Sequence, residues 1–292
     1  MWPQPDDPVL VRRMRAAHAL ACATLRVRPV RGEHQIWGWH GRTLGQAVIS
    51  RHGPRWLRLH SVPANQIIET FWNGTIDAQR SMPSSVPRPR LLAYHDWTDQ
   101  QWAYRAELHQ SVSVRPVARH AVLTTDPHLP SAWWFALRSA LDDIAVVPTD
   151  RVTLHEGFLA WAMPHYLGTH IHDHASDSWT TAHGDLHYAN LCGPHLSILD
   201  WEGWGVAPDG YDAAMLHSYS LLVPTVAARV RDQFAGLFGT STGRFAELAV
   251  ITELLHTTTY GDNLELAAPL RQRAALLLGR TVPVVRRRPA GY

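Results

Sequence analysis

The stretch HGDLHYAN, residues 183–190, is soon followed by LSILDWE, residues 196–202, and together they break the regular patterns of the chain. Leucine and isoleucine dominate the first part of the second stretch, which predicts a short buried strand that ends at Asp200. Gly193-Pro194 between the two stretches is a turn signal, so we expect them to fold back on each other as a hairpin. Asn190 and Asp200 would then lie side by side at the open end of the hairpin.

Three oxygen-bearing side chains are expected at this end of the hairpin, because the loop that carries Asp185 leads into it. Carboxylate and amide oxygens suit Mg²⁺, which completes its coordination shell with substrate phosphates. Asn190 and Asp200 are the candidate metal ligands. The remaining carboxylate, Asp185, can accept a proton from an attacking hydroxyl group.

This combination resembles the catalytic block of the aminoglycoside phosphotransferase and choline kinase family, whose members are relatives of protein kinases. The family pattern is HGDxxxxN, then a short strand that ends in Asp, with an acidic residue two positions later, here Glu202. The sequence PDGYD at residues 208–212 also matches a motif that commonly follows in such proteins. The resemblance rests on about thirty residues, and a composite of this kind is more specific than a single glycine-rich motif.

The resemblance implies a role for each matching residue. Asp185 would be the catalytic base, on a loop shaped by His183 and completed by Asn190. Asn190 and Asp200 would hold the Mg²⁺ ions that bridge the nucleotide phosphates. Asp212 would brace the catalytic loop from the helical lobe.

Glu202 and the two tryptophans beside it, Trp201 and Trp204, are candidate substrate contacts. Glu202 would act either near the metal or against a cationic substrate. An aromatic face next to a carboxylate can hold an ammonium group. The alternative for both indoles is packing in the protein core.

Outside this block, strands come first and helices later, which favours an α+β fold with two lobes. We expect a small antiparallel β lobe at residues 1–108, with helices at 7–25 and 65–72, and a larger, mainly helical lobe at 109–292. The resemblance implies that this is a bilobal protein-kinase-like fold in which the first lobe binds nucleotide.

The first lobe departs from the family pattern in its phosphate-binding strand. Family members usually place a Lys there and pair it with a Glu on the next helix. This strand offers Arg58, with Glu69 on the expected helix, although the two could form an ordinary surface ion pair. Gly41 lies in the place of the phosphate-covering loop, and Glu107 and Leu108 in the place of the hinge that hydrogen-bonds adenine.

The composition excludes several classes of protein. All 27 positively charged residues are Arg, so a Walker P-loop, a pyridoxal enzyme and a Schiff-base aldolase are ruled out. The formal net charge of +2 gives no reason to expect nucleic acid or a membrane as a partner. The two cysteines suit a reducing cytoplasm and cannot form a four-Cys zinc site. The histidines around His172 are expected to form a polar loop and not a zinc site.

The leading hypothesis is a small-molecule kinase that moves the γ-phosphoryl group of ATP, or of GTP, to a hydroxyl of a small polar metabolite or antibiotic, with Mg²⁺ as cofactor. The alternative is a nucleotide-binding scaffold with weak activity or none, which the missing Lys favours. Intact Asp185, Asn190 and Asp200 favour the enzyme. The sequence does not identify the acceptor or the oligomeric state.

Overall fold

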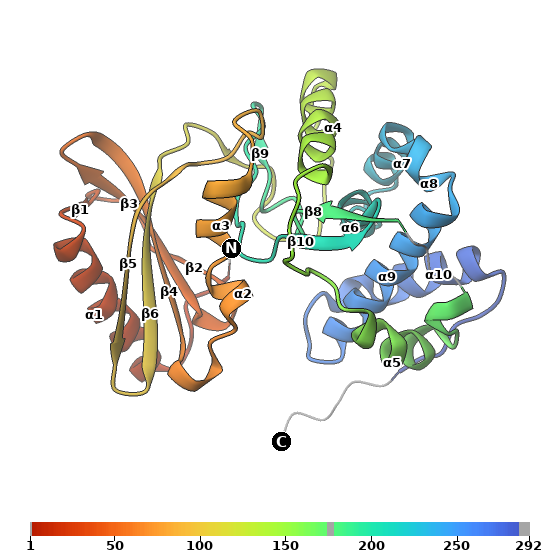
Figure 1. Cartoon of the computed structure of the whole chain (residues 1–292), viewed down its shortest axis with the longest axis horizontal. Helices are drawn as coiled ribbons and strands as arrows, with labels where there is room; N and C mark the ends of the chain where they lie inside the picture. Colours follow the sequence, from red (N-terminus) through yellow and green to blue (C-terminus); the bar gives the residue numbers. More distant parts are fainter. Residues whose placement is uncertain (1, 174–177, 286–292) are drawn as a thin grey trace. The chain divides into compact units, whose positions relative to one another are not determined.

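The computed structural model describes residues 2–173 and 178–285, and it divides into two compact units (Figure 1). The first, which we call the sheet unit, comprises Met1–Arg80, Arg88–Arg115 and Ser197–Glu202. The second, the helical unit, comprises Ser81–Pro87, Pro116–Leu196 and Gly203–Tyr292. Residues 108 and 109, where the sequence suggested a boundary, lie inside one strand of the sheet unit.

The sheet unit is built on a six-stranded antiparallel sheet with the order β1-β3-β4-β6-β5, in which β2 also pairs with β3. The strands are β1 (Arg28–Pro29), β2 (Ile36–Trp37), β3 (Thr43–Ser50), β4 (Gly53–Pro63), β5 (Leu91–Asp99) and β6 (Trp102–Gln110). The helices are α1 (Pro8–Thr24), α2 (Glu69–Trp72) and α3 (Gly74–Ser81), with 3₁₀ turns at Trp39–Gly41 and Ala64–Gln66.

Helix α1 packs against β4 and β6 and closes the core of the sheet unit. It begins where the Asp7 side chain accepts a hydrogen bond from the backbone N–H of Val9, which satisfies one of the free donors of the first turn. Because side chains alternate along a strand, Leu57 and Leu59 of β4 enter this core, and Arg58 between them lies on the opposite face of the sheet.

The helical unit surrounds the long helix α9. Its strands are β8 (Trp179–Ala182), β9 (Cys192–Gly193) and β10 (Gly205–Pro208), and β7 (Arg115–Pro116) has one residue in each unit. Its helices are α4 (Ser131–Ala145), α5 (Glu156–Leu167), α6 (Tyr211–Tyr219), α7 (Pro224–Gln233), α8 (Ala235–Phe238), α9 (Ser241–Thr258) and α10 (Ala267–Leu278), with 3₁₀ turns at Ile171–Asp173 and Leu264–Leu266. Helix α9 packs against α5, α6, α8 and α10, so it is buried on most sides. Among the helices of the described residues, none combines the length and apolar character needed to cross a bilayer.

The structure confirms the expected antiparallel sheet followed by a mainly helical part. Two local expectations were wrong. The helix expected at residues 65–72 is a 3₁₀ turn followed by the short α2. The hairpin expected around Gly193-Pro194 is not a regular one, because β9 pairs with β7 and the residues from 196 to 200 form no strand.

Candidate active site

The loop at residues 183–190 follows β8 directly and is fixed by Asp212 in the first turn of α6. The two carboxylate oxygens of Asp212 accept hydrogen bonds from the backbone N–H groups of His183, at 2.7 Å, and Gly184, at 3.0 Å. Burial raises the pKa of Asp212, and these two hydrogen bonds together with His183 oppose the rise. Gly184 has a φ of 87°, and a Cβ there would lie 2.7 Å from Thr153, so only glycine fits.

Asp185 presents its carboxylate from this loop, with its side chain 49% exposed. The Asn190 Nδ2 donates to Asp185 Oδ2 at 3.1 Å, and His187 Nε2 lies 3.5 Å from the same oxygen. Desolvation opposes the charged form, but His187, His183 and Asn190 outweigh it and lower the pKa of Asp185 to about 2. The carboxylate is therefore ionised at neutral pH, and it is better suited to orienting a hydroxyl group than to removing its proton early.

Asn190 is held in one orientation by Asp185. Its Nδ2 also donates to the backbone carbonyl of Asp185 at 3.0 Å. Because the amide nitrogen makes these bonds, the carbonyl oxygen of Asn190 is the atom that it can offer to a cation. The backbone N–H of Asp185 in turn donates to His183 Nδ1 at 3.3 Å, so His183, Asp185 and Asn190 are linked to one another within the loop.

The charge of Asp185 acts on Tyr211, Tyr219 and Glu253 of the helical unit, and Asp262 acts on the same Tyr219. We call Asp185, Tyr211, Tyr219, Glu253 and Asp262 the acid–tyrosine cluster. The Tyr211 hydroxyl donates to the Glu253 carboxylate. Burial raises the pKa of Glu253 to about 7, and the negative charge of Asp185 contributes to the rise. Burial also raises the pKa of Tyr219, with further contributions from Asp185, Glu253 and Asp262. Glu253 lies in the apolar helix α9, far along the chain from the motif, and no local pattern marks it.

The second group of charged residues lies in the sheet unit, around Arg58 on β4. Its guanidinium is 2.9 Å from Glu202, 3.1 Å from Asp200 and 3.6 Å from Glu107. These carboxylates raise the pKa of Arg58 against the cost of burial, so its charge is permanent. We call these four residues the Arg58 cluster; their formal charges add to −2.

Glu69 does not take part in the Arg58 cluster, and the expected Arg58–Glu69 pair was wrong. Glu69 is exposed on α2. Across residues 2–173 and 178–285, the ion pairs of Arg58 go to Glu107, Asp200 and Glu202. The physical reason is strand register, because β6 places Glu107 directly opposite Arg58.

Glu107 and Leu108 do not form the expected hinge. Both are buried in β6, which lies between β4 and β5, so their backbone groups belong to the sheet and cannot be offered to an adenine ring. Desolvation opposes ionisation of Glu107, but the hydrogen bond from His109 at 3.1 Å and the charge of Arg58 lower its pKa to about 2.

Local packing requires a glycine at position 41. It has a φ of 73°, and a Cβ at this position would meet the side chains of Pro5 at 2.6 Å and Leu10 at 2.9 Å. The residue is buried in the 3₁₀ turn at Trp39–Gly41. Its glycine therefore reflects the close approach of the N-terminal segment.

Asp200 and Glu202 join the sheet unit through a strained and tightly packed segment. Asp200 has a φ of 62°, a left-handed conformation that costs energy for a residue with a Cβ and that often occurs at functional sites. A Cβ on Gly74 would lie 2.1 Å from the backbone oxygen of Glu202, so the start of α3 packs directly on this segment.

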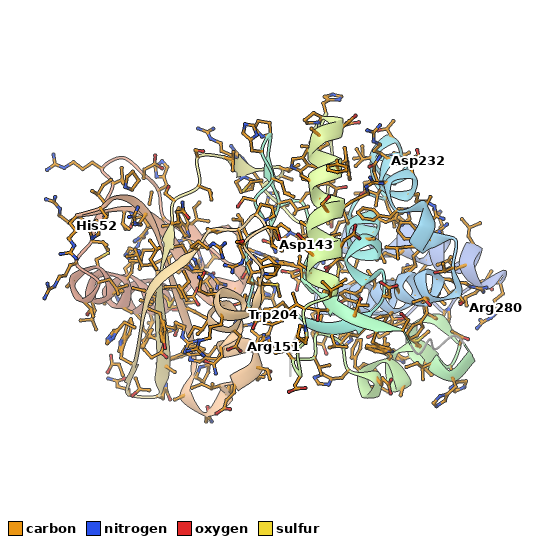
Figure 2. The ribbon with its side chains drawn as sticks, turned by 45° about the horizontal axis from the view of Figure 1, so that its top comes forward. His52, Asp143, Arg151, Trp204, Asp232 and Arg280 are labelled. Atoms are coloured by element: carbon orange, nitrogen blue, oxygen red, sulfur yellow. The ribbon has the colours of Figure 1, made fainter. Side chains whose placement is uncertain are left out.

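The expectation that Trp201 and Trp204 contact substrate was wrong, because both are buried, with 4% and 1% of their surface exposed. The Trp201 Nε1 donates to the backbone carbonyl of Ile198 at 2.9 Å. The Arg151 guanidinium lies 4.9 Å from the centre of the Trp204 ring, and Figure 2 shows the two residues beside each other. The alternative of core packing is therefore correct for both.

The donor atoms present suit Mg²⁺. In the sheet unit, Asp200 carries a carboxylate within a group of four side chains of excess negative charge. In the helical unit, Asn190 carries an oriented amide oxygen. Each is a type of donor that Mg²⁺ prefers. In the described part of the chain, no three His, Cys, Asp or Glu residues are grouped closely enough to hold a metal by themselves. That result includes His170 and His172; the neighbouring His174 lies outside the described residues.

Comparison with known proteins finds no family model and no curated protein that matches this sequence. Solved structures do match. The aminoglycoside phosphotransferase APH(4)-Ia has a TM-score of 0.63 at 12% identity, over 91% of this chain and 98% of that chain. A thermostable mutant of the same protein, in a ternary complex with AMP-PNP and hygromycin B, has a TM-score of 0.60 at 12% identity, over 86% and 94%. A microcompartment-associated aminopropanol kinase has a TM-score of 0.50 at 14% identity, over 90% and 96%. At these identities the likeness concerns the fold, and it confirms that this chain has the bilobal α+β, protein-kinase-like fold of the aminoglycoside phosphotransferases.

Proposed function

We propose that this chain is a small-molecule kinase that transfers the γ-phosphoryl group of ATP, or of GTP, to a hydroxyl group of a small polar molecule. The observation that carries the proposal is the half-exposed, ionised carboxylate of Asp185, oriented by Asn190 and His187 on a loop that Asp212 braces. The fold shared with phosphotransferases supports it.

In the proposed reaction, the acceptor hydroxyl oxygen attacks the γ-phosphorus while the bond from that phosphorus to the bridging oxygen breaks, and ADP leaves, or GDP when the donor is GTP. Asp185 would hold the hydroxyl by its hydrogen and take up the proton as the new P–O bond forms, then release it to solvent. A carboxylate with a pKa of about 2 can do this late in the reaction, because phosphoryl transfer needs little help from a base before bond cleavage.

The Asn190 carbonyl oxygen and the Asp200 carboxylate would hold Mg²⁺, which neutralises phosphate charge when it is bound. Arg58 would contact phosphate oxygens through its planar guanidinium, whose two parallel N–H donors match a phosphate. Glu107 would keep Arg58 in position from the neighbouring strand, and Glu202 would stay close to the metal ligands.

The acid–tyrosine cluster supports an acceptor that carries an amino group as well as a hydroxyl. The negative charges of Asp185, Glu253 and Asp262 all act on Tyr219 and raise its pKa. An ammonium group placed there would offset the mutual repulsion of these carboxylates. Both metabolites and antibiotics fit this description.

A nucleotide-binding scaffold without turnover is the second candidate. One observation favours it: Arg58 forms an ion pair with Asp200, the carboxylate that is proposed to hold the metal. If that pair persisted with nucleotide bound, Asp200 would be a poor metal ligand and chemistry would be slow.

Mass spectrometry separates the two candidates. The protein is incubated with ATP, Mg²⁺, cell-extract metabolites and a panel of amino-alcohol antibiotics, and phosphoryl adducts are sought. We expect an adduct whose rate of formation falls by roughly 10²–10⁴-fold in Asp185→Asn. The matched control Asp142→Asn, on an exposed position of α4, should keep full activity. Mg²⁺-dependent nucleotide binding with no adduct on any acceptor, unchanged in Asp185→Asn, would contradict the kinase and favour the scaffold.

A further inference from the structure

The helical unit contains a surface pocket of about 360 Å³ that no residue of the loop 183–190 lines. One wall is the segment that leads into α4, from Asp126 to Ser131, and the other is the first part of α7, with Thr225, Val226 and Arg229. The pocket lies within the size range of small-molecule sites, near its lower end.

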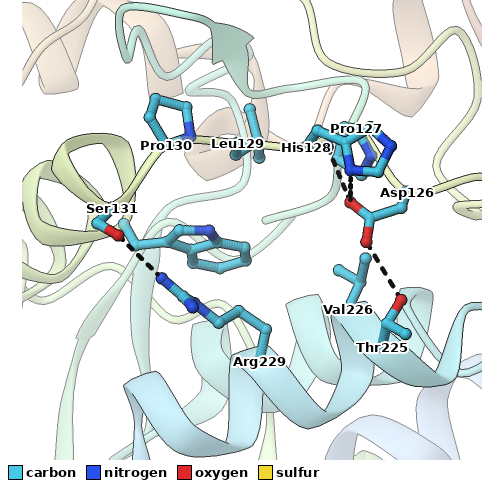
Figure 3. A pocket seen from close by; sticks show the side chains of 10 residues that line it. Asp126, Pro127, His128, Leu129, Pro130, Ser131, Thr225, Val226 and Arg229 are labelled. Carbon is cyan, nitrogen blue, oxygen red and sulfur yellow. Dashed lines mark hydrogen bonds and ion pairs between the residues drawn. The ribbon is translucent and has the colours of Figure 1, made fainter.

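Two opposite charges stand at opposite ends of this pocket (Figure 3). At one end the Asp126 carboxylate accepts a hydrogen bond from the Thr225 hydroxyl at 3.2 Å. At the other end the Arg229 guanidinium donates to the Ser131 hydroxyl at 3.2 Å. Within the described ranges, Asp126 and Arg229 make no ion pair with each other, and Arg229 makes none with any carboxylate.

The neighbours of each charge leave it able to bind a ligand. Only one of the five N–H donors of Arg229 is used by Ser131, whose own hydroxyl hydrogen can still donate. The His128 Nδ1 lies 3.5 Å from the Asp126 Oδ1. Because the His128 side chain is 88% exposed, water weakens the ion pair between the two residues. The backbone N–H of His128 donates to Asp126 at 2.8 Å and fixes the direction of the carboxylate.

The floor of the pocket is apolar. The side chains of Trp134 and Val226 line it, and only 3% of each is exposed. Leu129 lines the wall on the α4 side. A ligand that reached both charges would therefore touch only the small exposed part of these side chains, so its two charged groups would make the main contacts.

We propose that this pocket binds a small zwitterion, an α-amino acid. The carboxylate of the ligand binds Arg229 and the Ser131 hydroxyl, and its ammonium group binds Asp126. Each polar end then meets a charge of the opposite sign, which neither a simple anion nor a simple cation would achieve. This inference does not depend on the kinase proposal.

Isothermal titration calorimetry on the full chain tests it, with L-phenylalanine as the probe. Two matched compounds each lack one charge: N-acetyl-L-phenylalanine has no ammonium group, and phenethylamine has no carboxylate. We expect saturable binding of phenylalanine and affinity at least about tenfold lower for either compound, since a hydrogen bond to a charged group contributes at least that much. Equal affinity for all three, or no heat with phenylalanine up to about 10 mM, the limit of weak specific binding, would overturn the proposal.

Variants locate the binding. Arg229→Gln and Asp126→Asn should each weaken phenylalanine binding by about tenfold or more, and Arg229→Lys should lose less because the charge remains. Arg244→Gln, at an exposed position of α9, is the matched control and should bind as the unmodified chain does. Unchanged binding in both Arg229→Gln and Asp126→Asn would show that the ligand sits elsewhere. Thermal unfolding of each variant distinguishes loss of the site from loss of the fold.

Discussion

Both units hold a cluster of carboxylates, but the two clusters differ in what neutralises them. In the Arg58 cluster a permanent cation lies among Glu107, Asp200 and Glu202, and the pKa of Glu107 is about 2. Around Glu253 in the acid–tyrosine cluster, the Tyr211 hydroxyl takes the place of a cation, and the pKa of Glu253 is about 7. The same side chain thus has opposite behaviour: Glu107 stays ionised, and Glu253 changes its charge near neutral pH.

The difference shows what each cluster can do. A cluster that contains a guanidinium keeps its charge over the whole neutral range, which suits a ligand of high negative charge. A cluster without one can gain or lose a proton according to what binds, which suits an acceptor that brings its own charge.

The largest effect is expected from removing the cation of the first cluster. Arg58→Met would leave three carboxylates together without their central guanidinium. We expect the free energy of unfolding to fall by about 3–5 kcal/mol at pH 7, the cost of breaking a buried ion pair from one side. Urea unfolding measures it. Arg58→Lys should recover part of the loss, and Arg28→Met, at an exposed position of β1, should change little. A loss below about 1 kcal/mol, the value of an exposed pair, would mean that water already screens the cluster.

The second largest change in the free energy of unfolding is expected from Glu107→Gln. The lowered pKa of Glu107 stabilises the fold above about pH 4.5, and this contribution disappears as the pH falls towards 2. Glu107→Gln should therefore lower the free energy of unfolding by about 2–3 kcal/mol at pH 7, with the gap from the unmodified chain closing in acid. Unfolding curves at several pH values measure the gap.

Glu69→Gln is the control for Glu107→Gln, because Glu69 is exposed in the same unit and was the partner that the sequence favoured. It should leave stability unchanged at every pH. If Glu69→Gln destabilised the protein and Glu107→Gln did not, the partner of Arg58 in solution would be the helix residue after all.

The smallest effect is expected from Glu253→Gln, and this substitution should stabilise the fold, whereas Arg58→Met and Glu107→Gln should destabilise it. The raised pKa of Glu253 makes its ionised form unfavourable in the folded state, so the cost is absent below about pH 4.5 and grows until about pH 7. Glu253→Gln can still accept the hydrogen bond from Tyr211, and it should raise the free energy of unfolding by about 2 kcal/mol at pH 8 and by nothing at pH 4. Thermal melts at the two pH values check this, with the exposed Glu265→Gln as control. A destabilised Glu253→Gln at pH 8 would contradict the assignment.

The parts of the site that could be predicted from the sequence are those in which neighbouring residues act together. The loop at 183–190 contacts itself, so the motif alone indicated that Asp185 and Asn190 would be close. The partner of Arg58 could not be predicted in this way, because it depends on how β4 and β6 pair along their length. Glu253 was missed because a single Glu in an apolar helix gives no sign of what it faces.

Three of the candidate site residues have surroundings that packing explains. Gly41, Trp201 and Trp204 are residue types that active sites use, but the same types also solve packing problems. Only the surroundings decide between the two uses. Gly41 faces Pro5 and Leu10, and the two indoles are enclosed by protein.

The segment Ser197–Glu202 belongs to the sheet unit although it is encoded within the stretch of chain that builds the helical unit. A polypeptide truncated after Arg115 would keep Arg58 and Glu107 but lack two of the three carboxylates that surround the guanidinium. A single crossover between two related genes could therefore not exchange the complete sheet unit. A hybrid protein would need Ser197–Glu202 and the strands of the sheet unit from the same parent.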